Sequence, residues 1–230
     1  MSIINVNGLK RIYNQGMENE VRALNGIQLN IEQGEFTAIV GPSGSGKTTL
    51  LNCIGGLDRV NEGSLTIDGR SIGDMAEQEL IDFRLHHIGF VFQAYNLIPV
   101  LSAKENVGFI MLLQNIPKAE IDTRVATLLK AVGLEDQLHK RPAQMSGGQQ
   151  QRVAVARALA SKPRFILADE PTANLDSKAT SSLLDIMEKL NKEEGVTFLF
   201  STHDQRVIDR ARRVITIEDG KIVSDQIQKM

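Results

Sequence analysis

The sequence lacks a strong net positive charge, a long apolar run and pairs of cysteines. It therefore shows no sign of direct binding to nucleic acid, of insertion into a membrane or of disulfide bonds formed in an oxidising compartment. Its 230 residues carry a net charge of −2, so no overall charge attracts it to nucleic acid or anionic lipid. No apolar run approaches the length of a membrane span, and the N-terminus lacks the basic and apolar regions of a signal peptide. The single cysteine, Cys53, cannot form an internal disulfide, and its apolar neighbours predict a core residue. These absences predict a cytoplasmic protein, in which any membrane role depends on a separate partner chain.

A glycine-rich loop is the most informative stretch that the chain does have. It fits the pattern G-x-x-x-x-G-K-[ST] at every fixed position, as Gly41-Pro42-Ser43-Gly44-Ser45-Gly46-Lys47-Thr48. The apolar residues before it predict a buried strand and those after it a helix, which is the context that the pattern needs. The glycines let several N–H groups point at one phosphate, and the helix N-terminus adds partial positive charge.

This loop predicts a nucleoside triphosphate site. Lys47 is expected to reach the β- and γ-phosphates, and the Thr48 hydroxyl is expected to bind Mg²⁺. The alternative is a turn that only joins a strand to a helix.

The rest of the chain predicts one α/β unit over residues 1–230, for which the 42% hydrophobic content is ample. Alternating residues in 3–8 and 27–31, and a hairpin around Asp68-Gly69, predict antiparallel strands beside the loop. A stretch of about 95–160 predicts an inserted helical subdomain. Within it, a capping-box pattern opens a helix at Ser102, and Gly133 ends another.

Polar residues follow several apolar runs at the points where the predicted strands end. Asp169 and Glu170 follow 164–168, and His203 lies shortly after 196–200. Solvated charges or a structural histidine are the alternative, but in a chain with a phosphate loop we expect Asp169 to hold Mg²⁺ through its shell and Glu170 to polarise a water. His203 lies at the same edge and is expected to contact the γ-phosphate. Tyr13, at a predicted strand end, is an ordinary strand aromatic or a platform for adenine.

A second glycine pair begins a helix further along the chain. Ser146 and Gln149 form a capping-box pattern, but the intervening Gly147 and Gly148 each weaken the first turn by about 1 kcal/mol relative to alanine. That cost is explained if a ligand must approach the backbone closely, and an anion would satisfy the exposed N–H groups. Asp176 is in a segment that caps a helix over about 178–190.

Together these motifs resemble the nucleotide-binding subunits of ABC transporters over nearly the whole chain, in order and in spacing. Gly41 to Thr49 resembles the Walker A loop, residues 165–170 the Walker B strand with its catalytic glutamate, and Ser146-Gly147-Gly148-Gln149 the signature motif. Gln93, Asp176 and His203 match the Q-loop glutamine, the D-loop aspartate and the switch histidine, and Tyr13 falls where the family stacks adenine. Met145 replaces a leucine that is more usual, which is a volume-conserving change.

Three stretches are similar to the lipoprotein-release and macrolide-export (LolD- and MacB-like) branch of this family. They are residues 55–58, 96–107 and 167–176, the last with Ala173 where glycine is commoner. The resemblance implies a RecA-like P-loop core with an antiparallel β subdomain and an inserted helical subdomain.

The resemblance also implies a mechanism with ATP and Mg²⁺. Two copies would bind ATP head to tail, with the Walker A loop of one, including Thr49, facing the signature motif of the other. Lys47 and the loop amides would hold the phosphates, while Thr48, Gln93 and Asp169 serve Mg²⁺. Glu170 would be the general base or water polariser, His203 would hold the γ-phosphate, and Asp176 would communicate across the dimer.

The partner implied is an integral membrane permease with few spans and a large extracytoplasmic domain. It would dock on the helical insertion and on residues 93–106, which places the protein peripherally on the cytoplasmic face of the inner or plasma membrane. Three alternatives exist: a DNA-repair or chromosome ATPase, a translation factor with tandem ATPase halves, and a non-catalytic regulatory subunit. The chain has no heptad run between its motifs, no internal repeat and a full set of Lys47, Glu170 and His203, so all three are disfavoured and no nucleic-acid partner is expected.

Overall fold

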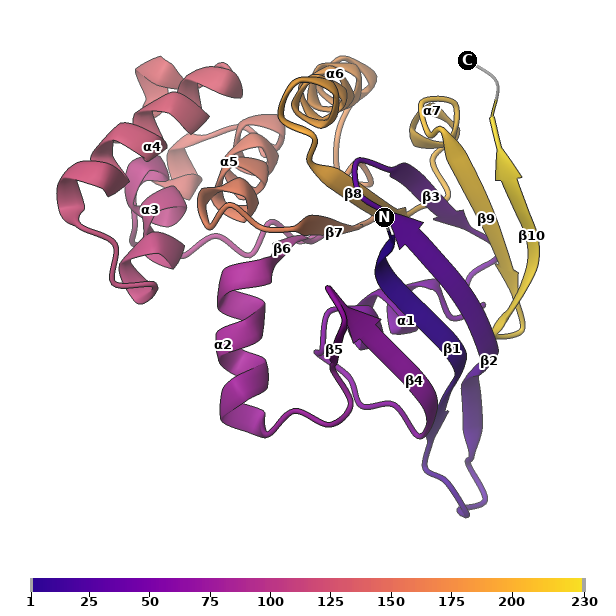
Figure 1. The fold of residues 1–230 in the computed structure, drawn as a ribbon. Helices are drawn as coiled ribbons and strands as arrows, with labels where there is room; N and C mark the ends of the chain where they lie inside the picture. The colour runs from indigo at the N-terminus through magenta and orange to yellow at the C-terminus, as the bar shows by residue number, and fades with distance from the viewer. Residues whose placement is uncertain (1, 229–230) are drawn as a thin grey trace.

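The computed structural model describes residues 2–228, which form two sheets with helices around them (Figure 1). The larger sheet has the strand order β10-β9-β3-β8-β7-β6. Its strands are β3 (Phe36–Val40), β6 (Ile88–Val91), β7 (Phe165–Asp169), β8 (Thr197–Ser201), β9 (Arg213–Glu218) and β10 (Lys221–Ile227). Only β10 runs antiparallel to its neighbour. The central strands are almost wholly buried, as expected of a parallel sheet covered on both faces.

The smaller sheet is antiparallel, in the order β2-β1-β4-β5. It consists of β1 (Ser2–Tyr13), β2 (Val21–Glu32), β4 (Glu62–Ile67) and β5 (Arg70–Ser71). The predicted hairpin is confirmed, since Asp68 and Gly69 both take positive φ, 49° and 75°, between β4 and β5. Helix α1 (Lys47–Ile54) shares one core cluster with this sheet and with one face of the larger sheet.

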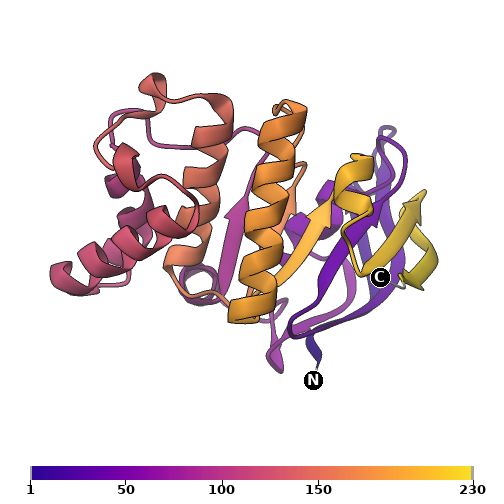
Figure 2. The same cartoon turned by 90° about the horizontal axis from the view of Figure 1, so that it is seen from above.

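The other face of the larger sheet packs on helices. A second core cluster joins it to α3 (Ala103–Leu113), α4 (Lys118–Ala131), α5 (Gly147–Ala160) and α6 (Ser177–Glu194). Figure 2 shows α5 and α6 side by side over the sheet, with α3 and α4 beyond α5. Helices α3 to α5 fall within the range predicted for the helical subdomain. Two short 3₁₀ turns, Glu135–Gln137 and Pro142–Gln144, connect α4 to α5.

The predicted α/β fold class is confirmed, and local signals placed several element ends correctly. Ser102 caps α3 with a capping box, and Gly133 takes a φ of 66° just beyond α4.

Helix α2 (Glu77–His87) was not predicted, because Phe83 is its only buried residue and its sequence shows no apolar stripe. A one-turn helix, α7 (Gln205–Ile208), follows β8. Within the described residues, no helix combines the length and apolar character needed to cross a bilayer.

Cys53 lies in the core as predicted, with only 1% of its surface exposed. Burial raises the pKa of its thiol to about 12. The thiol therefore stays protonated and has a packing role.

Candidate functional site

The glycine-rich loop connects β3 to α1 and is pressed closely between neighbouring strands. A Cβ on Gly41 would lie 2.0 Å from the Ile217 carbonyl oxygen, and one on Gly46 would lie 2.4 Å from the Ala23 carbonyl oxygen. Both glycines have positive φ, 145° and 105°. Only glycine therefore fits at these two positions, for steric and for conformational reasons.

The N-terminus of α1 presents backbone N–H groups without a side-chain cap. Gly46 is the N-cap residue and has no side chain with which to accept them. The first N–H groups of a helix have no partner within the helix, and the helix dipole adds partial positive charge there. This is the arrangement expected of an anion site.

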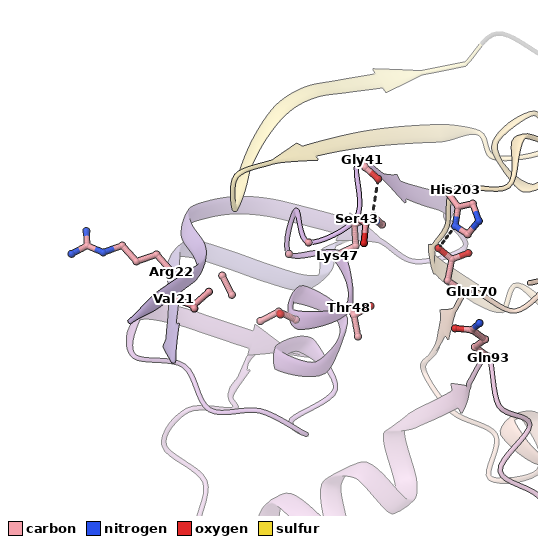
Figure 3. A pocket seen from close by; sticks show the side chains of 13 residues that line it. Val21, Arg22, Gly41, Ser43, Lys47, Thr48, Gln93, Glu170 and His203 are labelled. Atoms are coloured by element: carbon pink, nitrogen blue, oxygen red, sulfur yellow. Dashed lines mark hydrogen bonds and ion pairs between the residues drawn. The ribbon is translucent and has the colours of Figure 1, made fainter. Parts of the chain in front are cut away.

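Lys47 brings a positive charge to the same loop. Its Nζ atom donates a hydrogen bond to the Gly41 carbonyl oxygen (Figure 3) and another to the Pro42 carbonyl oxygen, each at 2.9 Å. An ammonium group has three donors, so these two bonds leave one N–H for a further acceptor while fixing the side chain over the loop.

Thr48 and Asp169 meet across the site from different elements. The Thr48 hydroxyl oxygen lies 3.1 Å and 3.2 Å from the two carboxylate oxygens of Asp169. Oxygen donors of this kind suit Mg²⁺. Across residues 2–228, no group of three or more His, Cys, Asp or Glu side chains could hold a metal by itself. The donor set therefore fits an ion that takes its remaining ligands from phosphate and water, as Mg²⁺ commonly does.

Glu170 and His203 form an ion-pair geometry at the ends of β7 and β8. His203 Nδ1 lies 2.7 Å from Glu170 Oε1, and the Thr202 hydroxyl lies 3.4 Å from Oε2. Glu170 takes a φ of 45°, which is uncommon for a residue other than glycine, and its N–H donates to the Ser201 carbonyl at 2.8 Å. This turn directs the carboxylate towards His203, and such backbone conformations are concentrated at functional sites.

A second contact joins the same two loops just behind this pair. The Thr172 hydroxyl donates to Asp204 at 2.8 Å, and the backbone N–H, Nε and Nη2 of Arg206 also donate to that carboxylate. The hydrogen bonds from Arg206, together with that from Thr172, lower the pKa of Asp204 to about 2 despite its burial. Asp204 is therefore ionised at neutral pH and ties the loop after β7 to the loop after β8.

Lys47, Thr48, Glu170 and His203 line one cavity of about 530 Å³ (Figure 3), whereas Asp169, which contacts Thr48, is not among its lining residues. In Figure 3, Gln93, Glu170 and His203 lie on one side and the glycine-rich loop on the other. The predicted residues that line it are Gly41, Ser43, Gly44, Gly46, Lys47, Thr48, Thr49, Gln93, Glu170 and His203. Of the remaining loop residues, Pro42 is exposed and Ser45 is buried with its carbonyl accepting from the Gly220 N–H. The structure thus brings together residues from four parts of the chain.

Three further residues line the cavity that the sequence did not single out. Val21, Arg22 and Ala23 begin β2, and Arg22 points away from the loop in Figure 3. Nothing in their residue types indicates a site. Tyr13 is not among the lining residues, but it is the strand partner of Val21 and so lies next to the cavity.

The predicted second anion site lies outside this cavity. Ser146 caps α5 with the expected capping box, in which its Oγ accepts from the Gln149 N–H at 3.3 Å. A Cβ on Gly147 would lie 2.6 Å from the Tyr95 hydroxyl, so this glycine also has a packing role. Asp176 caps α6 and accepts a bond from Ala179 at 2.8 Å. Neither motif lines the cavity of its own chain.

The segment around Gln93 is held by side chains for which the sequence predicted no such role. Gln151, which is fully buried, donates to the Phe92 and Pro171 carbonyls at 3.4 Å and 2.8 Å. Arg157 donates to the Tyr95 carbonyl at 3.0 Å and also bonds Asn96. Asn174 donates to the Gln93 carbonyl at 3.0 Å. The sequence does carry one indication of this role, because Gln151 and Arg157 are polar residues on the apolar side of the helix that begins at Gly147.

Comparison with known proteins agrees with this geometry. A family model described as "ABC transporter" matches residues 24–173. An uncharacterised ABC transporter ATP-binding protein of Thermotoga maritima is 48% identical over 92% of this chain and 90% of its own. The lipoprotein-releasing system ATP-binding protein LolD 1 of Rhodopseudomonas palustris is 45% identical over 96% and 98%.

A longer relative and a solved structure extend the comparison. The macrolide export ATP-binding/permease protein MacB of Hyphomonas neptunium is 47% identical over 99% of this chain, which spans only 35% of that protein. A dimeric post-hydrolysis structure of the cassette MJ0796 with ADP and Pi superposes with a TM-score of 0.90, at 42% identity and 99% coverage of both chains. These similarities extend over nearly the whole chain. The chain belongs to the ABC transporter family, as an ATP-binding subunit that hydrolyses ATP.

Proposed function

We propose that two copies of this chain close head to tail around ATP and that this closure drives a separate membrane permease. The observation that carries the proposal is that the signature motif lies outside the cavity formed by the phosphate loop of the same chain. Lys47 and Glu170 line the cavity, whereas the capped N-terminus of α5 at Ser146 does not. A second copy would supply its α5 N-terminus to the γ-phosphate, so ATP would stabilise the closed dimer through contacts that ADP lacks.

We assign the phosphates to Lys47 and the loop N–H groups. The third N–H of Lys47 is available to a phosphate oxygen while the carbonyls of Gly41 and Pro42 hold the side chain. Thr48, Asp169 and Gln93 are the residues proposed to hold Mg²⁺, which when bound neutralises charge on the phosphates. Support for this comes from the Thr48–Asp169 contact and from the position of Gln93 on the cavity wall.

Glu170 is proposed as the residue that polarises the attacking water. Its Oε1 atom is held by His203, and among residues 2–228 the one hydrogen bond to Oε2 is the 3.4 Å contact with Thr202, so Oε2 is the oxygen available to accept a proton from water. The water oxygen forms the new bond to the γ-phosphorus, the bond to the bridging oxygen breaks, and ADP leaves with that electron pair. His203, with 75% of its side chain exposed, is proposed to hold the γ-phosphate.

The signature residues Ser146, Gly147, Gly148 and Gln149 are proposed to face the ATP bound to the partner copy. Asp176 is proposed to communicate across the dimer, and Tyr13 to stack on adenine. Each proposal rests on a position outside or beside the cavity, where a second copy or the base would approach.

The permease is proposed to dock on the helical insertion and on residues 93–106. This region exposes apolar side chains that do not pack on its own core: Val100, Leu112 and Leu113 are 69%, 61% and 50% exposed. We take these exposed apolar side chains as part of the proposed contact surface, because contiguous exposed apolar area marks protein interfaces. The relatives LolD 1 and MacB are named as the ATP-binding protein of a lipoprotein-releasing system and as a macrolide export ATP-binding/permease protein, which supports a permease partner and attachment to the membrane. That the permease has a large extracytoplasmic domain and that this chain lies on the cytoplasmic face are parts of the proposal that rest on the resemblance alone.

The test is a pull-down from detergent-solubilised membranes with Glu170→Gln and ATP, compared with Glu193→Gln on the exposed side of α6. We expect a permease with a large extracytoplasmic domain to copurify with Glu170→Gln, in an ATP-dependent manner. Recovery of soluble partners, ribosomes or nucleic acid instead would keep the ATPase chemistry but overturn the transport assignment.

A further inference from the structure

Three side chains, Arg11, Tyr13 and Asp58, form a cluster beside the cavity, and the proposed chemistry gives a role only to Tyr13. Arg11 and Tyr13 lie two residues apart at the end of β1, and Asp58 lies on the loop after α1. The Arg11 guanidinium carbon is 4.3 Å from the centre of the Tyr13 ring, and Arg11 Nη2 is 2.7 Å from Asp58 Oδ1. The Tyr13 hydroxyl donates a short hydrogen bond to Asp58 Oδ2. One carboxylate therefore holds both the ring and the cation that covers it.

The cluster is largely withdrawn from solvent. The side chains of Arg11 and Asp58 are each 18% exposed. Burial opposes ionisation of Asp58, but the hydrogen bonds from Tyr13 and Arg11 hold the pKa of its carboxyl below the ordinary value. Burial, together with the bond to Asp58, raises the pKa of the Tyr13 phenol. At neutral pH the phenol is thus the donor and the carboxylate the acceptor, so the direction of the bond is fixed.

The cluster lies next to the nucleotide cavity. Tyr13 is the strand partner of Val21, which lines the cavity. Its hydroxyl also interacts with the side chain of Thr49, another lining residue. Because Arg11 covers one face of the ring, only the opposite face is available to a flat ligand.

We propose that Arg11 and Asp58 are positioning residues that fix the Tyr13 ring so that its open face stacks on the base of the bound nucleotide. This inference rests on the proposed function, in which Tyr13 stacks on adenine. If the Tyr13 side chain could rotate freely, binding of the base would have to fix it, and this loss of conformational entropy would weaken binding. Because Asp58 already fixes the side chain in the folded protein, binding does not bear that cost. The cluster therefore improves affinity for the base and leaves affinity for the phosphates unchanged.

A purely structural role makes a different prediction. If the cluster only ties the end of β1 to the loop after α1, its loss lowers the free energy of unfolding and affects all ligands alike. The comparison of a ligand that has a base with one that lacks it separates the two roles. ADP and inorganic pyrophosphate serve this purpose, because both present a diphosphate to the loop and only ADP carries a base.

The experiment measures ADP binding by calorimetry, and pyrophosphate binding by competition with ADP, for wild type and three variants. In Tyr13→Ala we expect ADP affinity to fall roughly 5- to 150-fold, the range for loss of one aromatic–base stack. In Asp58→Ala we expect a fall of about 2- to 10-fold, the cost of ordering one side chain. The double variant is expected to bind ADP like Tyr13→Ala alone, and no variant changes pyrophosphate affinity.

A matched control comes from a neighbouring ion pair of the same sheet. Lys10 and Glu62 are 2.6 Å apart, and in the described part of the chain no hydrogen bond or ion pair joins either of them to Tyr13, so Glu62→Ala should leave both affinities unchanged. If Asp58→Ala does not fold, Arg11→Met and Asp58→Asn provide the same comparison. Asp58→Asn keeps an acceptor for the phenol and is expected to retain more ADP affinity than Asp58→Ala.

The outcomes separate the two proposals. The positioning role is wrong if Asp58→Ala lowers the affinities for ADP and pyrophosphate equally. It is also wrong if Asp58→Ala lowers ADP affinity as much in the Tyr13→Ala background as it does in wild type. If wild type binds pyrophosphate as tightly as ADP, base stacking is absent and this inference fails while the phosphate site stands. If wild type binds neither ligand, the proposed function itself fails.

Discussion

His203 Nδ1 lies 2.7 Å from Glu170 Oε1, although the two residues follow different strands. The strands fix this distance, because Asp169 pairs with Ser201 in the parallel register of β7 and β8 and the Glu170 N–H continues that ladder to the Ser201 carbonyl. The pair is therefore positioned by the sheet, and Thr172 and Asp204 join the two loops a second time.

The first prediction concerns the role of Glu170. Glu170→Gln keeps the shape of the side chain but removes the proton acceptor, so we expect ATP turnover to fall about 10²- to 10⁴-fold while ATP still binds. Steady-state phosphate release measures the rate, and size-exclusion chromatography with ATP measures the trapped dimer. Hydrolysis at the wild-type rate would remove Glu170 from the mechanism.

The second prediction concerns the close approach at Gly41. In Gly41→Ala the new Cβ would overlap the Ile217 carbonyl oxygen at 2.0 Å, so we expect both a lower free energy of unfolding and loss of nucleotide binding. Gly44→Ala is the control, because it has a positive φ of 78° but open space around the added Cβ. For the unfolding free energy of Gly44→Ala we expect only a conformational cost of about 1–2 kcal/mol, measured by urea unfolding, and this control does not apply to nucleotide binding because Gly44 lines the cavity. Equal losses of unfolding free energy in Gly41→Ala and Gly44→Ala would show that the close contact of Gly41 with β9 does not contribute to stability.

The third prediction concerns the buried contacts behind Gln93. Arg157→Met removes the bonds to the Tyr95 and Asn96 carbonyls and leaves them without this partner, so we expect a loss of about 1–3 kcal/mol in unfolding free energy. We also expect faster hydrogen exchange at residues 92–96. Arg164→Met, which breaks an ion pair of a 57% exposed arginine with Asp68, should change neither quantity appreciably. Unchanged exchange in Arg157→Met would mean that Gln151 and Asn174 suffice to hold the segment.

The fourth prediction concerns pH and follows from Asp204. Its pKa in the folded protein is about 2, below the ordinary value of 3.8, so its stabilising contribution is complete above pH 3.8 and is lost as the pH falls through 2. Wild type should therefore lose stability over this range more steeply than Asp204→Asn. Chemical unfolding at intervals between pH 2 and 5 measures the difference. Parallel curves would show that Arg206 and Thr172 do not lower this pKa.

Much of the fold could be predicted because its signals are local. The phosphate loop, the hairpin at Asp68-Gly69 and the capping boxes at Ser102 and Ser146 each depend on residues within a few positions of one another. Helix α2 could not be predicted, because it packs on the rest of the protein through one buried residue, Phe83, and its sequence therefore has no periodic apolar pattern.

The residues of the candidate site could be predicted from their types and from their positions at the ends of strands. The contacts that hold these residues in place could not be predicted. The sequence by itself determined that Lys47, Asp169, Glu170 and His203 follow buried strands, and parallel strands bring such ends to one edge. Only the tertiary structure decided that Gln151 and Arg157 hold the segment around Gln93, and that Asp58 holds Tyr13. Those contacts join residues 45 to 62 positions apart, and their geometry depends on how helices and loops pack on the sheets, which no local pattern records.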